Sequence, residues 1–460
     1  MWRWGRILLG TFFLGAFLAK VRPARAEDLN QAWAIALQVN GKLLAQQDES
    51  RASALNVQAA RAARLPSIKN QTFNAIVTPT PTFGTGGQSN PGAAAAGGLS
   101  ILGRGQYDIP LSNTAVSLPI YNGGRLKHNV EAASAQLGAQ RAEEFRTALD
   151  LKLNVAEAYV GVLRAEKDLA VSDSNVARLS AFLNDVLNRK TEGMATLNDR
   201  LTAEVSLSNA RQDQIRVQKN LSVAWAKYNR YLCRPLTFTT KLAEESVPAA
   251  SGEIDDLVSM TLRSRPELAA GSEAEIQAIT AEALHRRPEL ASLGEQARSL
   301  AAQAEAAKAG TRPSVSINTG YTYVGLNSLS NQNLFTSLVS VNWTLTDAGA
   351  TRRKTEALYG QERAARHRRA DAAADIGLEI RTYWLDLAET RRRIPVTREA
   401  VSQAEENVKV LSDRYREGLS TYTQVLDAEA LRVQTLTNYH AAVYDAVLAA
   451  FRLRRAIGSL

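Results

Sequence analysis

The stretch REGLSTYTQVLDAEA, residues Arg416 to Ala430, has an earlier counterpart in TEGMATLNDRLTAEV, residues Thr191 to Val205. Both contain Glu-Gly, then a turn rich in hydroxyl side chains, then a helical pattern with Ala-Glu at the same distance. Their glycines, Gly193 and Gly418, are typical of the left-handed residue that ends a helix. The doubled turn predicts an internal repeat, and a repeat decides the fold.

The repeat extends well beyond the turn. Residues 122–124 (NGG) align with residues 347–349 (DAG) at the same separation as the two glycines, 225 positions. Further upstream Pro66 aligns with Pro313 at 247 positions, so the first half carries 22 extra residues. These hold the stretch FGTGGQSNPGAAAAGG, which is typical of a flexible loop. The sequence therefore predicts two tandem structural repeats, residues 27–235 and 257–460, joined by an inter-repeat equatorial segment at 236–256.

Within each repeat the hydrophobic period changes in the same order, which predicts helix, strand, loop, strand, very long helix, turn and helix. The predicted elements of the first repeat are an opening helix at about 29–65, a β-hairpin at about 66–120, a long helix at about 124–190 and a return helix at about 196–232. Those of the second are helices at about 257–312, a β-hairpin at about 313–345, a long helix at about 350–416 and a return helix at about 421–457.

The predicted strands alternate apolar and polar residues over a length that suits a tilted membrane strand. The apolar sets are Phe73, Ala75 and Val77; Val116, Leu118 and Ile120; Val315, Ile317, Tyr321 and Tyr323; and Phe335, Val339, Val341, Trp343 and Leu345. A soluble, half-buried hairpin has the same pattern, so the alternation leaves both possibilities open.

The long helices carry heptad-like apolar stripes on Ala-, Glu- and Arg-rich sequence, which indicates coiled-coil packing. A helix over 124–193 would be about 100 Å long, and the opening and return helices about 55 Å each. Two shorter helices stacked end to end thus match one long helix, which predicts a tall helical column. We expect a kink at Pro395.

The first residues have the features of a secretory signal peptide, 1–26: a basic start, a short apolar core and an Ala-x-Ala cleavage site. This segment holds five basic and no acidic residues, so it supplies much of the formal net charge of +9, which says little about nucleic acid. Cys233 is the only cysteine, so neither a disulfide framework nor a lipid-bearing cysteine is expected.

No later segment is long and apolar enough for a transmembrane helix, so entry into a membrane would use the β-strands. Four strands cannot close a barrel alone. Membrane-inserted hairpins therefore predict a closed ring of identical chains.

Together these features resemble the TolC family of bacterial outer-membrane efflux proteins. LPIYNGG, with Pro119, Gly123 and Gly124, is similar to the family's strand–helix junction, and TDAG, ending in Gly349, is a weaker counterpart. The resemblance implies an α+β membrane protein: a homotrimer with a 12-stranded β-barrel in the outer membrane on an α-helical tunnel that spans the periplasm of a Gram-negative bacterium. It implies a passive exit duct for tripartite efflux or type I secretion. The implied partners are a periplasmic adaptor, an inner-membrane pump or ABC transporter, and outer-membrane lipid.

The resemblance also implies roles for individual residues near the doubled turn. The turns would contact the adaptor through Gly193, Met194, Gly418, Leu419 and Ser420. The periplasmic entrance would be gated by Asp199, Tyr415, Gln424 and Asp427. Gln424 and Ser420 depart from the residues of the family's best-known member, which puts its arginine–aspartate latch in doubt here. The alternative for Asp199 and Asp427 is a solvated helix face, or a first-turn carboxylate facing the helix dipole.

No enzyme, cofactor, metal or nucleic-acid motif competes with this interpretation. The histidines, His128, His285, His367 and His440, lack partners at ligand spacing. The glycine-rich segments lack the Lys-Ser/Thr of a phosphate loop, and the basic run RHRRAD (366–371) suits a solvated helix. The remaining alternative is a soluble periplasmic coiled-coil adaptor or structural protein.

Overall fold

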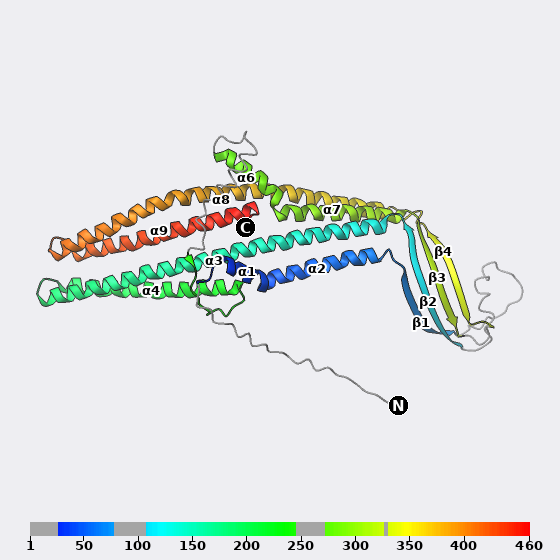
Figure 1. Cartoon of the computed structure of the whole chain (residues 1–460), viewed down its shortest axis with the longest axis horizontal. Coiled ribbons are helices and arrows are strands. Elements are labelled where there is room, and N and C mark those ends of the chain that lie inside the picture. Colours follow the sequence, from blue (N-terminus) through cyan, green and yellow to red (C-terminus); the bar gives the residue numbers. More distant parts are fainter. Residues whose placement is uncertain (1–25, 78–106, 245–271, 326–329) are drawn as a thin grey trace, which may run out of the picture. The chain divides into compact units, whose positions relative to one another are not determined.

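The computed structural model describes residues 26–77, 107–244, 272–325 and 330–460 (Figure 1). The predicted signal peptide up to residue 25, the glycine-rich loop and most of the inter-repeat segment lie outside the described residues. The chain forms two compact units, and each draws on three separate stretches. The first unit lies within Met1–Val39, Asn154–Glu253 and Ala388–Ala450, and the second within Asn40–Leu153, Ile254–Leu387 and Phe451–Leu460.

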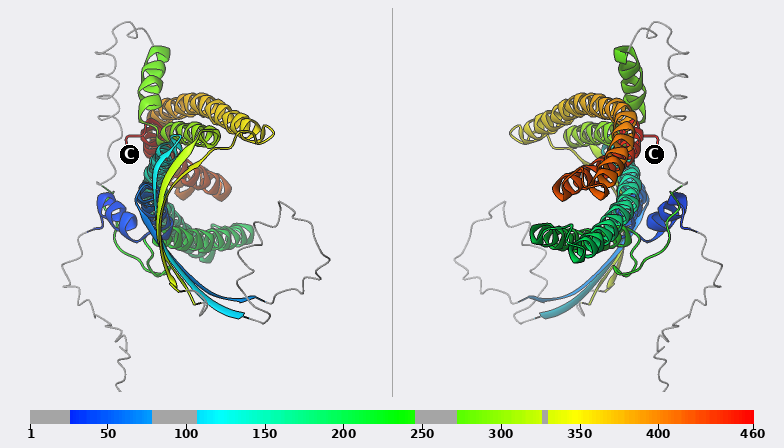
Figure 2. Two further views of the ribbon diagram at one scale, coloured as in Figure 1. Left: turned by 90° about the vertical axis from the view of Figure 1, so that its right-hand side faces the viewer. Right: turned by 90° about the vertical axis from the view of Figure 1, so that its left-hand side faces the viewer.

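The second unit contains one antiparallel sheet in the order β1-β2-β3-β4. Its strands are β1 (Ser67–Val77), β2 (Tyr107–Asn122), β3 (Ser314–Val324) and β4 (Asn333–Asn342). The pairing of β2 with β3 joins the two halves of the chain. Figure 2 shows the strands curving together as one layer.

The register decides which apolar residues share a face of the sheet. Tyr321 lies opposite Phe335, and Ile317 opposite Val339, so the apolar sets of β3 and β4 fall on one face. In the first hairpin the apolar pairs change face along the strands: Ile68 lies opposite Val116, whereas Phe73, an odd number of residues further on, lies opposite Leu111. The sets predicted for β1 and β2 therefore point to opposite faces. Single-strand alternation cannot reveal this, because face assignment needs the pairing register.

The sheet's second and fourth strands are each followed, after a short turn or loop, by a long helix. These long helices are α3 (Arg125–Thr191) and α8 (Ala350–Arg416), each of 67 residues. α8 continues through Pro395. There the hydroxyl of Thr397 donates to the carbonyl oxygens of Arg393 and Ile394, both at 3.0 Å.

The shorter helices precede the strands or follow the long helices. They are α1 (Leu29–Val39), α2 (Gly41–Ala62), α4 (Leu197–Tyr231), α6 (Ser272–Arg286), α7 (Pro288–Lys308), the 3₁₀ turn η4 (Ala309–Thr311) and α9 (Tyr422–Ile457). The predicted opening helix is thus two helices. Asn40 separates them because its side chain caps α2, accepting from the backbone N–H of Lys42 at 3.1 Å.

A buried polar cluster in the first unit surrounds Glu27, two residues before α1. The carboxylate of Glu27 accepts from both terminal nitrogens of Arg234, at 2.8 and 3.0 Å, and from the hydroxyl of Tyr228 at 3.1 Å. The hydroxyl of Tyr159 contacts the backbone oxygens of Glu27 and Ala243, each at 2.8 Å. Burial, with the nearby Glu27 carboxylate, raises the pKa of Tyr228.

Among the helices that the structure describes, none carries an apolar stretch sufficient to cross a membrane.

Candidate functional site at the tip turns

The two turns that suggested the repeat have the same backbone structure. We call residues 192–196 and 417–421 the tip turns. Gly193 and Gly418 both adopt a φ of 77°, the left-handed conformation expected of a helix stop. The next N–H, of Met194 or Leu419, donates to the carbonyl oxygen five residues earlier, at 2.8 Å in both turns. Each long helix therefore ends in a Schellman motif.

The return helices begin in matching capping boxes. In the first tip turn the carboxylate of Asp199 accepts from the backbone N–H of Thr196 at 2.9 Å, and the threonine hydroxyl accepts from the Asp199 N–H at 3.1 Å. In the second, Gln424 and Thr421 exchange the same two hydrogen bonds, at 3.1 and 3.4 Å. Asp199 and Gln424 thus occupy equivalent positions, and both side chains stabilise the first turn of a helix.

Below the tip turns the four helix ends share one apolar core. Its buried members are Val186 from α3, Ala203 from α4, Tyr415 from α8, and Tyr422 and Val425 from α9. The rings of Tyr415 and Tyr422 lie 5.8 Å apart. Burial raises the pKa of Tyr422 to about 12 and that of Tyr415 in the same direction. No residue that the structure describes bonds to the buried Tyr422 hydroxyl oxygen.

Arg189, in the last turn of α3, connects the two halves of the chain at this core. Its Nη1 donates to the carbonyl oxygen of Tyr415 at 3.1 Å, and its Nη2 donates to that of Arg416 at 3.0 Å. Its Nε lies 3.6 Å from the carboxylate of Asp185, one turn earlier. The carbonyl oxygen of Tyr415 also accepts from the Gly418 N–H at 3.1 Å, so the guanidinium is its second donor. Arg189 thus adds side-chain hydrogen bonds to carbonyl oxygens at the end of α8. The aligned residue in the second half, Arg414, makes no such contact with any described residue.

A second connection between the two halves of the chain lies earlier in α3, further from the tip turn, and involves buried charges. Glu429 is 1 % exposed, and its carboxylate pairs with Arg432 at 2.7 Å and with Arg178 at 3.4 Å. Arg178 and Arg189 are three helical turns apart, so they lie on the same side of α3. Both contact the second half of the chain.

The remaining predicted entrance residues differ in their surroundings. Asp427 is exposed and makes no hydrogen bond or ion pair with any residue of the described ranges. The hydroxyl of Ser420 donates to the carbonyl oxygen of Leu411 at 3.1 Å. The predicted adaptor residues Met194 and Leu419 are 66 % and 64 % exposed.

The predicted strand–helix junctions lie in the second unit. The β2–β3 register shifts just after Pro119. Gly123 has a φ of 64°, and a Cβ there would lie 2.6 Å from the Cβ of Arg312, so only glycine fits. Gly124 and Gly349 also have positive φ, at 93° and 80°.

The residue two positions before Gly124, and likewise before Gly349, caps the long helix that follows. The Asn122 side chain accepts from the N–H of Leu126 at 3.1 Å, and the carboxylate of Asp347 accepts from the N–H of Thr351 at 2.8 Å. Hydrogen bonds from Thr351 and Gly349 lower the pKa of Asp347.

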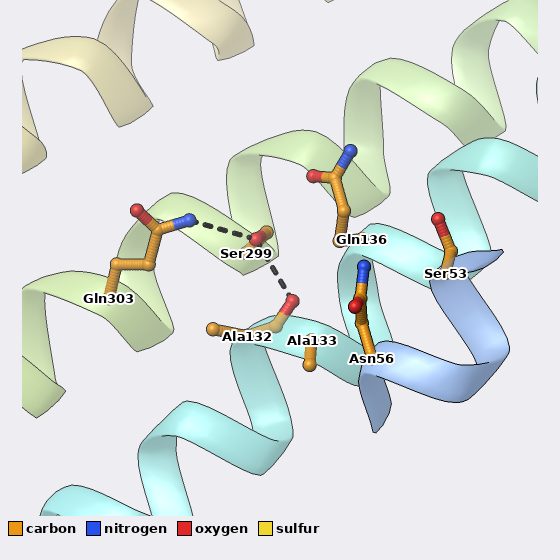
Figure 3. Close-up of a pocket in the computed structure, with 7 residues that line it drawn as sticks. All are labelled: Ser53, Asn56, Ala132, Ala133, Gln136, Ser299 and Gln303. Atoms are coloured by element: carbon orange, nitrogen blue, oxygen red, sulfur yellow. Dashed lines mark hydrogen bonds between the residues drawn. The ribbon is translucent and has the colours of Figure 1, made fainter. Parts of the chain in front are cut away.

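A pocket among α2, α3 and α7 presents uncharged polar side chains (Figure 3). Ser299 donates to the carbonyl oxygen of Ala132 at 3.0 Å, and Gln303 donates to the Ser299 hydroxyl at 3.2 Å. The lining contains no acid, base or nucleophile beyond serine hydroxyls. Over the described ranges no cluster of His, Cys, Asp and Glu could hold a metal ion.

Sequence reasoning missed the cross-connecting residues Arg189, Arg178 and Glu429. Arg189 aligns with an arginine that makes no equivalent contact, and Glu429 aligns with the half-buried Glu204, so neither stands out in the alignment of the halves. The capping role of Asp199 and Gln424 was readable, because each follows a threonine by three residues.

Comparison with known proteins identifies this architecture. The sequence pattern of the family described as outer membrane efflux protein matches residues 34–232 and 279–459. Among solved structures, the outer-membrane channel OprN is 18 % identical with a TM-score of 0.75, covering 94 % of this chain and 90 % of its own. The outer membrane protein VceC from Vibrio cholerae is 16 % identical with a TM-score of 0.75, covering 94 % and 96 %. CusC is 16 % identical with a TM-score of 0.76, covering 95 % and 93 %. No curated protein sequence matches the chain.

Proposed function

Because the chain belongs to the outer membrane efflux protein family and is an outer-membrane efflux channel, we propose that it works as the passive exit duct of a tripartite efflux or type I secretion system. It would receive substrates from an inner-membrane pump or ABC transporter through a periplasmic adaptor, with no catalytic step of its own. The family match confirms the predicted resemblance and the outer-membrane location.

The observation that carries the proposal is the open sheet of four strands. β1 and β4 are its outer strands, so each has an edge that no other described strand pairs. Unpaired backbone groups facing lipid are strongly unfavourable, so such a sheet in a membrane requires neighbours. Three copies, pairing β4 of one with β1 of the next, would give a 12-stranded barrel and a homotrimer.

Large apolar side chains on the sheet support this assignment. Phe335 is 70 % exposed, Val341 is 65 % exposed and Ile68 is 72 % exposed in the single chain. Side chains of this kind at such exposure are typical of a surface that another chain or lipid covers. The helical parts of residues 27–235 and 257–460 would then be two tandem repeats of a periplasmic tunnel.

The tip turns would form the periplasmic entrance of this duct. Met194 and Leu419 offer exposed apolar contacts for an adaptor. Arg189 would hold the two tips of one chain together, and Asp427 would present an unpaired carboxylate at the entrance. Asp199, Tyr415 and Gln424 would support that entrance by capping and packing.

The test is fractionation of cells that express the protein, followed by electrophoresis with and without heating. We expect a heat-modifiable trimer in the outer-membrane fraction. With Cys233 replaced by serine, one cysteine in β1 and one in β4 should cross-link between copies. A soluble periplasmic monomer would refute the duct and favour the coiled-coil adaptor.

A further inference from the structure

A pocket of about 310 Å³ lies between the end of α7 and the first turns of α8. It is lined by Lys308, Thr311, Thr351, Arg352, Thr355, Glu356 and Tyr359. Thr351, Thr355 and Tyr359 succeed one another at four-residue steps, so they form one stripe on α8. The pocket thus combines hydroxyl groups from one helix with cations from two.

Thr355 is the least satisfied member of the lining. The residue is 8 % exposed, and its hydroxyl oxygen bonds to nothing in the described chain. A threonine within a helix commonly donates to the carbonyl oxygen four residues earlier, and no such bond forms here. A buried hydroxyl without a partner is unfavourable, so this position favours a ligand that can accept from it.

The two cations of the pocket have only weak partners. Lys308 lies 3.7 Å from Glu305, whose carboxylate already accepts from the Tyr359 hydroxyl at 2.6 Å. Arg352 pairs with Glu356 at 2.9 Å, but its side chain is 83 % exposed. Exposed pairs of this kind contribute little, so both cations can turn toward a stronger anion.

The nearby charges add to this positive field. Arg353 and Lys354 are exposed on the first turns of α8 and make no ion pair with any described residue, and Arg312 follows η4. Two further acids lie nearby: Asp347 is engaged in capping α8, and Glu362, close to Tyr359, is paired with Arg366.

An apolar, membrane-type surface adjoins the pocket. The indole N–H of Trp343, just after β4, donates to the carbonyl oxygen of Thr311, a lining residue, at 3.1 Å. Trp343 is 60 % exposed and Leu345 is 78 % exposed. Tryptophan is enriched where a membrane meets water, so the pocket opens at the depth where lipid headgroups would lie.

The first half of the chain lacks this combination of residues. At the aligned positions Val130 replaces Thr355, Leu126 replaces Thr351 and Ser134 replaces Tyr359. The basic residues are retained there as Arg61 and Lys127. The first half thus keeps the two basic residues and one hydroxyl, that of Ser134, but lacks both threonine hydroxyls. A general need for positive charge at the junctions does not explain this difference.

We propose that this pocket binds the phosphate of an anionic glycerophospholipid, with Lys308 and Arg352 as its cations and Thr355 as a hydroxyl donor. Arginine, lysine and hydroxyl groups are the usual ligands of phosphate oxygens. The acyl chains would lie along the exposed apolar residues of β4 and its continuation. The site rests on the proposed function, because it requires the strands to be in the membrane.

The test is native mass spectrometry of the full-length, delipidated protein titrated with phosphatidylglycerol. Phosphatidylcholine and inorganic phosphate serve as separate probes. Thr355→Val keeps the volume and copies the first half, and Lys308→Gln/Arg352→Gln removes the two cations. The matched control is Arg61→Gln/Lys127→Gln, which removes the same charge from the aligned positions. Single-channel conductance of each variant reports separately on the duct.

We expect one high-affinity phosphatidylglycerol per chain, weakened about tenfold by the double variant and severalfold by Thr355→Val, with little change in the control. If the control variant weakened phosphatidylglycerol binding as much as the pocket variants, general electrostatic attraction would explain the binding and the proposed site would be overturned. Inorganic phosphate binding as tightly as the lipid would overturn the lipid as occupant, and binding unchanged in both pocket variants would overturn the pocket. Wild-type protein that forms no channel would instead refute the duct.

Discussion

The guanidinium of Arg189 lies 4.9 Å from the centre of the Tyr415 ring and also donates a hydrogen bond to the carbonyl oxygen of the same residue. One side chain from α3 thus contacts both the ring and the backbone at the end of α8. Neither contact depends on Ser420 or Gln424. In the proposed entrance, the two tip turns of a chain would therefore be held by residues other than those of the family's best-known member.

Replacing Arg189 with lysine should loosen the tip turns. An ammonium group lacks the planar fork that reaches two carbonyl oxygens, so about 1–3 kcal/mol of local stability would be lost. Hydrogen exchange of the amides between residues 411 and 420 should become faster, and closed-state conductance should rise. Arg414→Lys is the matched control, and an equal change in both variants would contradict the assignment.

Asp199 can be tested by separating its charge from its capping role. Asp199→Gln copies the second tip turn, so it should keep the capping box and leave closed-state conductance near the wild-type value. Asp199→Ala removes the cap, costs about 0.5–2 kcal/mol and should raise that conductance. If both variants raise it equally, the carboxylate itself closes the entrance.

Asp427→Asn should reduce the preference of the channel for cations, because it removes an exposed carboxylate that no described residue neutralises. Reversal potentials across a bilayer with a salt gradient measure this preference. Asp413→Asn is the comparison, since Asp413 is paired with Arg416 at 3.0 Å. Unchanged ion selectivity in the Asp427 variant would remove this residue from the entrance.

Tyr415 and Tyr422 belong to the apolar core below the tip turns, which we call the tip core. They predict that the stability of the fold decreases at alkaline pH. Folding raises the pKa of Tyr422 to about 12, so the folded state favours the neutral phenol. The stability from this preference is complete below the unfolded pKa of about 10 and is lost as the pH rises through 12. Thermal unfolding should therefore be insensitive to this phenol up to about pH 10 and weaken above it.

Tyr422→Phe is the control for that transition. It removes a buried hydroxyl without a partner and should stabilise the tip core at neutral pH by roughly 1 kcal/mol. The difference in tyrosinate absorbance between wild type and variant should lie above pH 10. A difference that titrates near pH 10 would show that this phenol is not buried.

Glu429→Ala should strongly destabilise the helices that lead to the tip turns. It leaves Arg432, whose side chain is 3 % exposed, without its carboxylate, and breaking a buried pair costs about 3–5 kcal/mol. Chemical denaturation followed by fluorescence measures the loss. Glu204→Ala, at the aligned and half-buried position, should cost less than 1 kcal/mol. Equal losses would mean that burial of Glu429 does not govern its contribution.

Local signals in the sequence located the turns and helix starts well. Gly193 and Gly418 have the expected left-handed backbone, and α3 and α8 begin one residue after Gly124 and Gly349. Such features depend on a few neighbouring residues, so a single sequence carries them. The interruption at Asn40 is equally local, since asparagine is a preferred N-cap residue, but the helical pattern on both sides of it conceals the break.

Features that depend on pairing could not be read in the same way. The change of apolar face between Ile68 and Phe73 follows from the register with β2, which alternation within one strand does not specify. The roles of Arg189 and Arg414 differ although the residues align, because only packing brings one of them to a helix end.

Arg189 makes its contact in one half of the chain only, and this affects how many partner molecules the proposed entrance could bind. In the proposed trimer each chain supplies two tip turns whose backbones match. In each chain only the second turn, 417–421, follows a helix end that accepts hydrogen bonds from an arginine of the other half, Arg189. The entrance would therefore have threefold rather than sixfold symmetry. A partner that binds only the tip turn 417–421 would dock as three copies per channel. A partner that binds both tip turns would dock as six copies.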